Sequence, residues 1–392
     1  MANISFDPLT GVRLQALPPL SLYVHIPWCI RKCPYCDFNS HEQKGGLQEA
    51  RYIDALTSDL DYALPNIWGR KVYSIFFGGG TPSLFSAEGI DRVLANIRAR
   101  VSLDPDAEIT LEANPGTFEF EKFRGFRAAG VNRLSIGIQS FNAAHLKALG
   151  RVHDADEARR AVEIGLAHFD NLNLDLMFAL PNQTPAECEA DVATAIGFAP
   201  PHLSIYHLTL EPNTLFHRFP PALPDDDLAA DMQQMIAGRT AAARYGHYET
   251  SAYAQPNRQS RHNLNYWRFG DYLGIGAGAH SKISFPDRIV RQVRFKQPAQ
   301  YMEAALAGNA IQEDKVVGMK ELPFEFMLNA LRLAEGFDIG LFEERTGLSI
   351  ANIRRQLDAA ESRGLVERDL ARIRPTEQGR RFQNDLLELF LP

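Results

Sequence analysis

Residues 21–36 read SLYVHIPWCIRKCPYC, which joins a short apolar run to three closely spaced cysteines. The run over residues 21–26 ends at a proline, and an apolar run bounded by a turn residue is typical of a buried β-strand. The thiols follow at once with C-x3-C-x2-C spacing, at Cys29, Cys33 and Cys36. The sequence therefore predicts a strand that presents three thiols at its carboxyl end.

The order of apolar run, turn and amphipathic stretch continues along the chain. Further strands are predicted at residues 72–77, 108–111, 133–138, 172–178 and 203–210. Helices are predicted between them, at residues 47–64, 87–100, 155–168 and 185–198. Strand-then-helix units in series indicate an α/β fold with a parallel sheet and right-handed crossovers. Because a closed TIM-type barrel needs eight such units, we expect an open, partial (β/α)6 barrel.

Polar residues and glycines stand where these predicted strands end. They are Cys29, Gly78, Gly79, Gly80, Glu112, Gln139, Asp175 and Glu211. A barrel of this type carries its active site at the carboxyl ends of the strands, so we expect these residues around one mouth. The alternative is that they are ordinary turn residues, since turns are rich in glycine and polar side chains.

The composition limits the classes of protein that this chain can represent. It has 392 residues, 45% of them hydrophobic, with 41 basic and 48 acidic side chains and a net charge of −7. The acidic balance argues against binding nucleic acid as the main task, and no apolar run is long enough to span a membrane. Four cysteines are too few for a disulfide framework, so a cytoplasmic, reducing location is expected.

Four parts are predicted along the chain. They are an N-terminal segment (1–20), the barrel (21–245), a connecting region (246–315) and a C-terminal domain (316–392). The last part has the pattern of a helix-turn-helix followed by two short strands, so it is predicted to be mainly helical and winged-helix-like. Winged helices often bind DNA, but from Asp338 onward nine arginines are matched by ten acidic residues. Because this part lacks the basic excess of a DNA-binding surface, we favour a domain that packs on the barrel as a cap over one that binds DNA.

Three thiols on one tight loop suit an iron–sulfur cluster or zinc, since both bind sulfur in tetrahedral geometry. A structural zinc site needs a fourth ligand, and His25 or His41 could supply it. A cubane cluster held by three cysteines instead leaves one iron open for a substrate or cofactor. The spacing alone leaves both kinds of site open. The remaining cysteine, Cys188, falls in a predicted helix and is expected to be a small buried side chain.

The cysteine motif carries a specific resemblance to known proteins. C-x3-C-x2-C with Tyr35 before the last cysteine resembles the signature of radical S-adenosylmethionine enzymes, and GGGTP at residues 78–82 resembles their glycine motif. With YVHIPWC, FGGGTPS, LEANPGT, RLSIGIQSF, LGRVH and LDLMFALP, the whole chain resembles the oxygen-independent coproporphyrinogen III oxidase family. HNLNYW at residues 262–267 resembles the HNxxYW signature of the heme chaperone branch of that family.

The resemblance implies two cofactors and the residues that hold them. Cys29, Cys33 and Cys36 would bind a 4Fe-4S cluster, whose fourth iron binds the amino and carboxylate groups of S-adenosyl-L-methionine. Reductive cleavage of the sulfonium bond would give methionine and a 5′-deoxyadenosyl radical. The family positions around S-adenosyl-L-methionine, its adenine and the substrate are Tyr23, Tyr35, Gly79, Gly80, Thr81, Glu112, Gln139, Arg151 and Asp175.

The chain departs from the oxidase in two places. The oxidase keeps a further cysteine two residues after the third, where this chain has Phe38, and it has a long N-terminal extension, whereas only 22 residues precede Tyr23 here. HNLNYW indicates heme instead, with His262 as a candidate axial ligand and Tyr266 and Trp267 as walls for the macrocycle. The alternative is a structural loop in which His262 bonds neighbouring groups and the aromatic residues are core.

The resemblance therefore implies a heme chaperone that binds heme and delivers it to apo-hemoproteins. Its expected partners are heme, apo-hemoprotein acceptors and an electron donor such as a flavodoxin or ferredoxin, with transient membrane contact and no nucleic acid. The first alternative is oxidative decarboxylation of coproporphyrinogen III to protoporphyrinogen IX. The second is a zinc-stabilised, winged-helix regulator of transcription, which the acidic balance disfavours.

Overall fold

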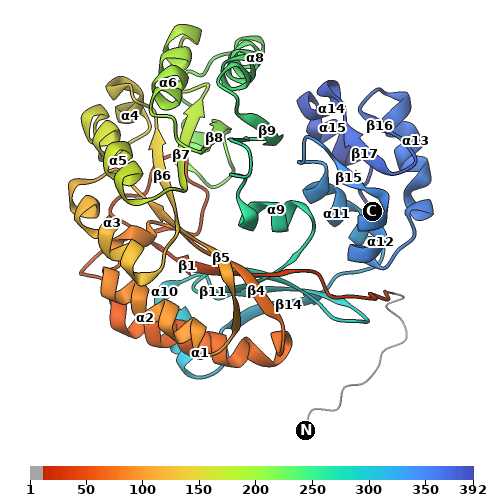
Figure 1. Ribbon diagram of the computed structural model, residues 1–392, viewed down its shortest axis with the longest axis horizontal. Coiled ribbons are helices and arrows are strands. Elements are labelled where there is room, and N and C mark those ends of the chain that lie inside the picture. Colours follow the sequence, from red (N-terminus) through yellow and green to blue (C-terminus); the bar gives the residue numbers. More distant parts are fainter. Residues whose placement is uncertain (1–11) are drawn as a thin grey trace.

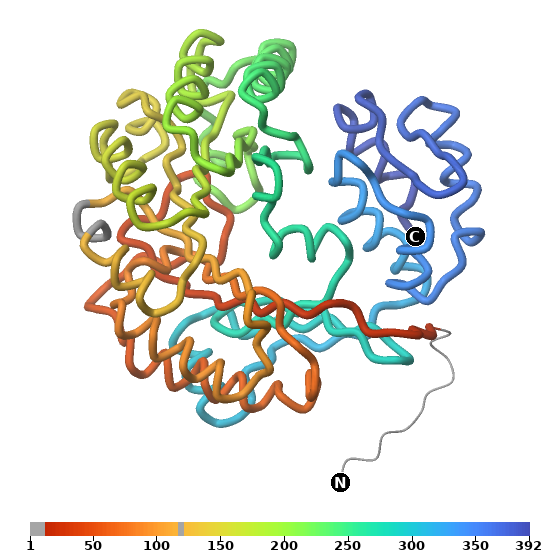
Figure 2. Tube along the Cα trace, in the orientation of Figure 1, coloured from red at the N-terminus to blue at the C-terminus, as the bar shows by residue number. Residues whose placement is uncertain are grey.

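Figures 1 and 2 show the computed structural model, which describes residues 12–392. In the helix that begins at Thr117, only the backbone of residues 117–120 is described. Residues 1–11 of the predicted N-terminal segment lie outside the described residues. The described end of that segment is packed, because Val12 and Leu14 are buried in the core of the C-terminal domain.

Neighbouring parallel strands form the centre of the main sheet in chain order. They are β1 (Leu20–Ile26), β4 (Lys71–Gly79), β5 (Ser102–Ala113), β6 (Arg133–Gln139), β7 (Leu172–Phe178) and β8 (His202–His207). The helices between them cover one face of the sheet (Figure 1): α1 (Glu49–Ile67), α2 (Ala87–Arg98), α3 (Thr117–Ala129), α4 (Ala143–Ala148), α5 (Ala155–His168) and α6 (Pro185–Gly197). This arrangement confirms the predicted α/β fold and its open, partial (β/α)6 barrel. Every predicted strand is present, although β5 begins at Ser102 instead of residue 108 and β8 ends at His207 instead of residue 210.

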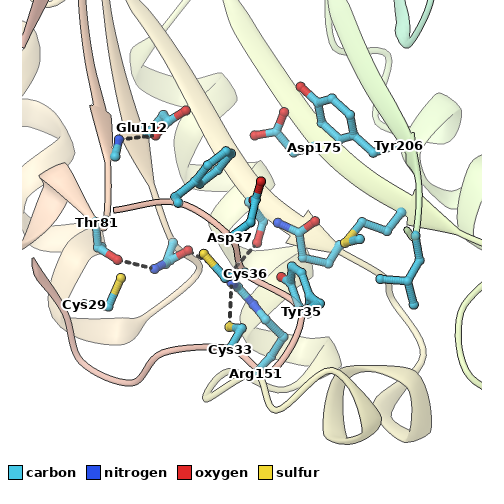
Figure 3. Close-up of a pocket in the computed structure, with 18 of the residues that line it drawn as sticks. Cys29, Cys33, Tyr35, Cys36, Asp37, Thr81, Glu112, Arg151, Asp175 and Tyr206 are labelled. Atoms are coloured by element: carbon cyan, nitrogen blue, oxygen red, sulfur yellow. Dashed lines mark hydrogen bonds between the residues drawn. The ribbon is translucent and has the colours of Figure 1, made fainter. Parts of the chain in front are cut away.

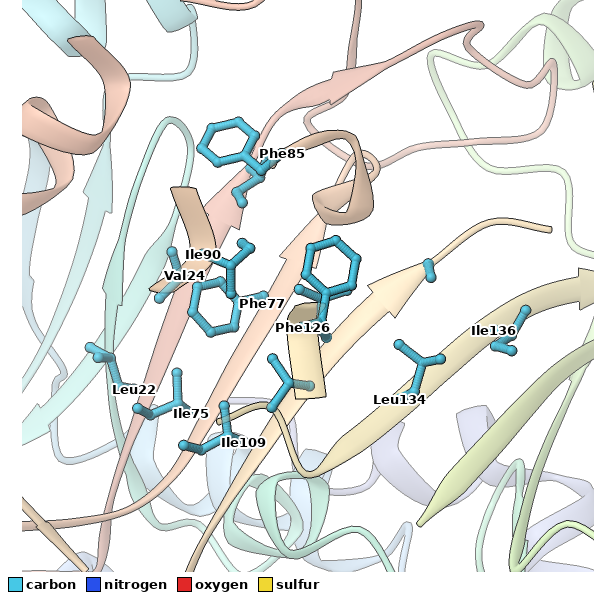
Figure 4. Close-up of a cluster of buried hydrophobic side chains, with 14 of the residues drawn as sticks. Leu22, Val24, Ile75, Phe77, Phe85, Ile90, Ile109, Phe126, Leu134 and Ile136 are labelled. Atoms are coloured by element: carbon cyan, nitrogen blue, oxygen red, sulfur yellow. The ribbon is translucent and has the colours of Figure 1, made fainter. Parts of the chain in front are cut away.

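Alternate residues of the strands separate an apolar outer face from a polar inner face. On the outer face, Val24 and Phe77 pack against helix side chains such as Phe126, as Figure 4 shows. The inner face carries small polar residues, all buried: Ser21, Ser74, Thr110, Ser135, Asn173 and Ser204. The hydrophobic core that stabilises the barrel therefore lies between the sheet and the helices, and the inside of the barrel holds polar groups.

The sheet continues on both sides of the barrel through residues 246–315, the predicted connecting region. On one side β11 (Asp271–Ile275) pairs in parallel with β1, and three antiparallel strands follow it: β12 (His280–Ser284), β13 (Ile289–Arg294) and β14 (Ile311–Val316). On the other side β10 (Ala252–Ala254) pairs with β8, and β9 (Gly246–Glu249) pairs with β10. The complete sheet has 12 strands, and the sequence pattern did not predict the outer ones.

Four further helices surround these outer strands. They are α7 (Leu215–Arg218), α8 (Asp226–Ala242), α9 (Arg261–Trp267) and α10 (Pro298–Leu306). Helix α9 contains the HNLNYW motif and lies on the inner face of the sheet. Its N-terminus is fixed by Glu108 of β5, whose carboxylate accepts hydrogen bonds from the backbone N–H groups of Arg261 (3.2 Å) and His262 (3.0 Å).

The C-terminal domain has its own small sheet and a core that also includes Phe269 and Ile289 from the connecting region. Its elements are α11 (Leu322–Ala330), β15 (Phe337–Asp338), α12 (Ile339–Thr346), the 3-10 helix η2 (Ile350–Ile353), α13 (Arg354–Ser362), β16 (Val366–Arg368), β17 (Arg372–Pro375), α14 (Glu377–Arg381) and α15 (Gln383–Glu388). Helices followed by the β16–β17 hairpin give the predicted winged-helix-like order, with strands arranged β15-β17-β16. Phe326 packs edge-on against Phe337 and Phe342 in the core. Among the described residues, no helix is long and apolar enough to cross a membrane.

Candidate cofactor site

The three cysteines lie on a loop, residues 27–42, that leaves the carboxyl end of β1. Two short strands close it, since β2 (Trp28–Cys29) pairs with β3 (His41–Glu42). The side-chain amide of Asn39 donates hydrogen bonds of 2.9 Å to the carbonyl oxygens of Ala277 and Lys296. The loop is therefore fastened at its base to the outer part of the sheet.

A cavity of about 350 Å³ opens at the carboxyl ends of the barrel strands, beside this loop (Figure 3). Tyr23, Gly78 and the heme candidates His262, Tyr266 and Trp267 do not line it. The other predicted site residues do: Cys29, Cys33, Tyr35, Cys36, Gly79, Gly80, Thr81, Glu112, Gln139, Arg151 and Asp175. Glu211, in the segment that follows β8, lines the same cavity. Phe38 lines it as well and is 61% exposed.

The thiols make few contacts within the protein. The Arg151 guanidinium donates to the Cys33 sulfur at 3.7 Å, and the Cys36 sulfur lies 3.6 Å from the Ser40 hydroxyl. Burial raises the pKa of the Cys29 thiol to about 11. Three thiols on one cavity, with a cation beside one of them, form a donor set that fits an iron–sulfur cluster bound through three cysteines.

The alternative of a zinc ion does not find its fourth ligand in this geometry. Both ring nitrogens of His25 are engaged, Nδ1 with the Tyr23 hydroxyl (3.0 Å) and Nε2 with the Asn39 carbonyl (2.9 Å). His41 Nε2 lies 3.2 Å from the Asn39 side-chain oxygen. The two histidines hold the loop in place instead.

The glycine motif at residues 78–82 allows the cysteine-bearing loop, residues 27–42, to pack closely against the end of β4. We call this loop the cluster loop. Gly79 has φ +116°, and a Cβ there would come within 2.5 Å of the His25 ring. A Cβ on Gly80 would come within 2.5 Å of the Trp28 carbonyl oxygen. The Gly80 and Thr81 N–H groups donate to the carbonyls of Ile26 (2.8 Å) and Trp28 (2.7 Å). These glycines are thus required for the close approach of β4 to the end of β1.

Two buried carboxyl groups lie on the inner wall of the cavity. Burial, together with the nearby charge of Asp175, raises the pKa of Glu112 to about 8. Glu112 accepts one hydrogen bond, from the Gly79 N–H at 3.2 Å. Burial also raises the pKa of Asp175, although hydrogen bonds from Ser135 (2.9 Å) and Asn173 (2.8 Å) oppose this. Carboxyl groups held this way are suited to a ligand that brings positive charge into the cavity.

Asn114 connects Thr81 on one wall of the cavity to Arg151 on another, and it was not predicted as a site residue. Its amide nitrogen donates to the Thr81 hydroxyl (2.9 Å), and its oxygen accepts from Arg151 (2.7 Å). Arg151 also donates to the Gly137 carbonyl at 2.8 Å, while its buried Nε has no partner among the described residues. The position of Asn114, two residues after Glu112 at the same strand end, was the signal available in the sequence.

The two predicted tyrosines differ in position. Tyr35 lines the cavity and lies against Phe216, with 6.4 Å between ring centroids. Tyr23 is on β1 and does not line the cavity, but its ring is stacked near Phe76, with 6.3 Å between centroids. Gln139 has φ +67°, an uncommon conformation for a side-chain-bearing residue, and it lines the cavity from the end of β6.

His262 lies away from the cavity, inside the barrel, and only 1% of its surface is exposed. Its Nδ1 is 2.9 Å from the Ser74 hydroxyl and its Nε2 is 3.0 Å from the Tyr266 hydroxyl. The ring stacks on Phe76, with 4.9 Å between centroids. Burial, with a smaller contribution from Arg133, lowers the pKa of His262 to about 3. In this arrangement neither ring nitrogen is available to a ligand unless a neighbour moves.

Comparison with known proteins identifies the family to which the chain belongs. Residues 23–195 match the Radical SAM superfamily, and residues 319–382 match the HemN C-terminal domain. Over 380 residues the chain is 50% identical to the heme chaperone HemW of Escherichia coli, covering 96% of this chain and 99% of that protein. The chain belongs to the HemW family. The heme chaperone HemW of Haemophilus influenzae is 49% identical over 384 residues.

A solved structure shares the fold of this HemW-family chain. It is that of coproporphyrinogen III oxidase (HemN) from Escherichia coli, described as a radical SAM enzyme. The TM-score is 0.81 at 25% sequence identity, with 95% of this chain and 90% of that chain covered. The likeness includes the C-terminal domain, so the two proteins share both the barrel and its appended helical part.

Proposed function

We propose that this chain is a heme chaperone, which binds heme and delivers it to apo-hemoproteins. The observation that carries the proposal is the 50% identity, over nearly the whole of both chains, to a protein named for that function. The replacement of the oxidase's extra cysteine by Phe38 agrees with it.

We also propose that the cavity holds a 4Fe-4S cluster through Cys29, Cys33 and Cys36, together with S-adenosyl-L-methionine. The cluster would supply reducing electrons to the bound cofactor. Glu112 and Asp175 would receive the positively charged end of the ligand, and Arg151 would orient a carboxylate. Gly79, Gly80, Thr81, Gln139 and Tyr35 would shape the remaining wall, and Tyr23 would support it from β1.

The proposal includes a cytoplasmic location and three kinds of partner. Apo-hemoproteins would receive the heme, and an electron donor such as a flavodoxin or ferredoxin would reduce the cluster. Contact with a membrane would be transient. His262 as the axial ligand of heme stays a prediction from the HNLNYW motif.

The competing function is decarboxylation of coproporphyrinogen III, which the shared fold with HemN makes the natural alternative. One experiment separates the two. Anaerobically reconstituted, reduced protein is given S-adenosyl-L-methionine with either heme or coproporphyrinogen III. We expect a stable heme complex with a Soret band, transfer of that heme to an apo-hemoprotein, and no protoporphyrinogen. Protoporphyrinogen formed over several turnovers would contradict the proposal.

A further inference from the structure

A second cavity of about 420 Å³ lies between the barrel and the C-terminal domain. In Figure 1, β8, α8 and β9 lie on the barrel side, facing α14 and α15 of the C-terminal domain. We call this cavity the C-terminal groove. Its lining residues include Phe178, Tyr206, His207, Tyr253, Arg332, Arg380, Arg381, Phe382 and Asp385. Tyr206, His207 and Thr209 line both this groove and the cofactor cavity, so the two cavities adjoin at the end of β8.

His207 is the accessible histidine at this junction. It is the last residue of β8 and is exposed, and no hydrogen bond to its ring exists within the described part of the chain. Its ring stacks on Phe178 at the end of β7, with 5.1 Å between centroids and 21° between planes. Partial burial lowers the pKa of His207, which favours the neutral imidazole that binds metals. His262, by contrast, is buried with both nitrogens bonded.

The opposite wall of the groove is cationic. Arg380 and Arg381 belong to α14, and among the described residues neither has an acidic partner within salt-bridge distance. Arg380 donates only a long hydrogen bond, of 3.4 Å, to the Pro375 carbonyl. Arg332 deepens the positive wall, although it is paired with Glu249 at 3.2 Å. Asp385 is the acidic residue in the lining, so the arginines outnumber it.

The groove also combines this charge with flat apolar surface. Phe382 is 49% exposed beside the arginines, and Tyr206 is 40% exposed on the barrel side. A ligand that fits both walls carries carboxylates at one edge and an aromatic body behind them. Heme has this chemistry, because its two propionates project from one edge of a macrocycle that holds an iron at its centre.

We propose that the C-terminal groove, and not the buried His262 of the HNLNYW motif, is the heme site, with His207 as an axial ligand and Arg380 and Arg381 as partners of the propionates. The inference rests on the proposed heme chaperone function. Binding forms one coordinate bond, in which an imidazole nitrogen donates its lone pair to the ferric iron and replaces a weakly held water or chloride. No electron is transferred in this step, and the propionates stay ionised.

The groove gives the HNLNYW motif a positioning role. The Arg332 guanidinium lies over the ring of Trp267, the last residue of the motif, with 4.3 Å between Cζ and the ring centroid. The Thr250 N–H, beside the groove, donates to the Arg332 carbonyl at 3.1 Å. Trp267 of the motif therefore positions Arg332 in the groove wall, and His262 anchors the motif to β4 through Ser74.

The test titrates full-length, reconstituted protein with three probes: ferric heme, its dimethyl ester and iron-free protoporphyrin IX. The variants are His207→Ala and the double variant Arg380→Gln/Arg381→Gln. Matched controls are His168→Ala on the outer helix α5 and Arg354→Gln on α13, neither of which lines the groove. His262→Ala is measured beside them, and melting temperatures verify that each variant is folded.

We expect His207→Ala to shift the Soret band and weaken heme binding about tenfold, with protoporphyrin IX binding changed less than about twofold. The arginine double variant is expected to bind heme and protoporphyrin IX about five- to tenfold more weakly. Its affinity for the dimethyl ester should stay within about twofold of that of the wild-type protein. If wild-type protein binds heme but both variants bind it equally well, or if only His262→Ala changes the Soret band, the groove assignment is overturned. If wild-type protein binds no heme, the proposed function itself fails.

Discussion

The guanidinium of Arg151 lies 3.7 Å from the sulfur of Cys33. Since Arg151 also bonds Asn114, and Asn114 bonds Thr81, one hydrogen-bonded chain runs from the cluster loop across the cavity to the glycine motif. A positive charge fixed beside one thiolate favours the electron-rich state of any cluster held there. The contact therefore links the redox behaviour of the site to the residues that shape its wall.

Replacing Arg151 is expected to lower the reduction potential of the cluster. Arg151→Gln removes both the charge and an N–H···S hydrogen bond, and a loss of about 1 kcal/mol corresponds to a fall on the order of 40 mV. A redox titration followed by absorbance or EPR measures it. Arg92→Gln, which removes an equally charged side chain from the outer helix α2, serves as the control. An unchanged potential in Arg151→Gln would show that the contact does not act on the cluster.

Each of the three loop cysteines is expected to be necessary for the cluster, whereas Cys188 is not. Cys188 is buried in α6 on the outer side of the barrel, and only 1% of its surface is exposed. Each of the variants Cys29→Ser, Cys33→Ser and Cys36→Ser should lose nearly all cluster iron and the associated absorbance after anaerobic reconstitution. Cys188→Ala should keep both at the wild-type level. Loss of iron in Cys188→Ala alone would place the ligand set elsewhere.

Glu112 is expected to make the stability of the cluster-free protein depend on pH. Its folded pKa of about 8, against an ordinary 4.5, means that the folded state holds a proton that the unfolded state releases between these values. The stabilising contribution is therefore complete below pH 4.5 and is lost as the pH rises through 8.

The melting temperature of the cluster-free protein, measured from about pH 6 to about pH 9, tests this expectation. It should fall less steeply in Glu112→Gln than in the wild-type protein, because the amide carries no titrating proton. Glu88→Gln, at an exposed position in the first turn of α2, should follow the wild-type curve. A variant curve parallel to the wild-type curve would remove Glu112 as the titrating group.

The core of the C-terminal domain is expected to be sensitive to a change at Phe326. This side chain is fully buried and touches three other aromatic rings, Phe269, Phe337 and Phe342. Phe326→Ala should lower the free energy of unfolding of this domain by about 3–5 kcal/mol. Leu328→Ala, two residues along the same helix and 44% exposed, should change it by less than about 0.5 kcal/mol. Chemical denaturation followed by near-UV circular dichroism measures both.

The barrel could be predicted from sequence because its strands are apolar runs that end at glycine, proline or polar residues. The outer strands could not, since they carry buried charged residues whose partners lie on other helices and strands. Arg294 on β13 is fully buried because it pairs with Asp59, 235 residues away, at 3.2 Å. Lys282 on β12 is likewise neutralised by Asp271 at 2.8 Å. A local pattern contains no sign that such charges will be paired.

Some residues of the candidate site could likewise be predicted from sequence, and others could not. Residues at the strand ends, such as Glu112 and Asp175, could be placed together because parallel strands end at one edge. Asn114 was missed because an asparagine before a proline is also typical of a turn. The buried His262 corresponds to the structural alternative stated from the sequence, but its partner Ser74 could not be named, because it belongs to a strand that lies far away in sequence.

The separation of the barrel into an apolar outside and a polar inside has a consequence for evolution. Substitutions among inner residues that carry no side-chain hydrogen bond, such as Thr110, remove little of the hydrophobic free energy that Val24 and Phe77 contribute on the other face. Natural selection can therefore alter the chemistry of the interior while the scaffold stays stable. A protein of this architecture is well suited to acquire a new ligand by drift at a few interior and rim positions.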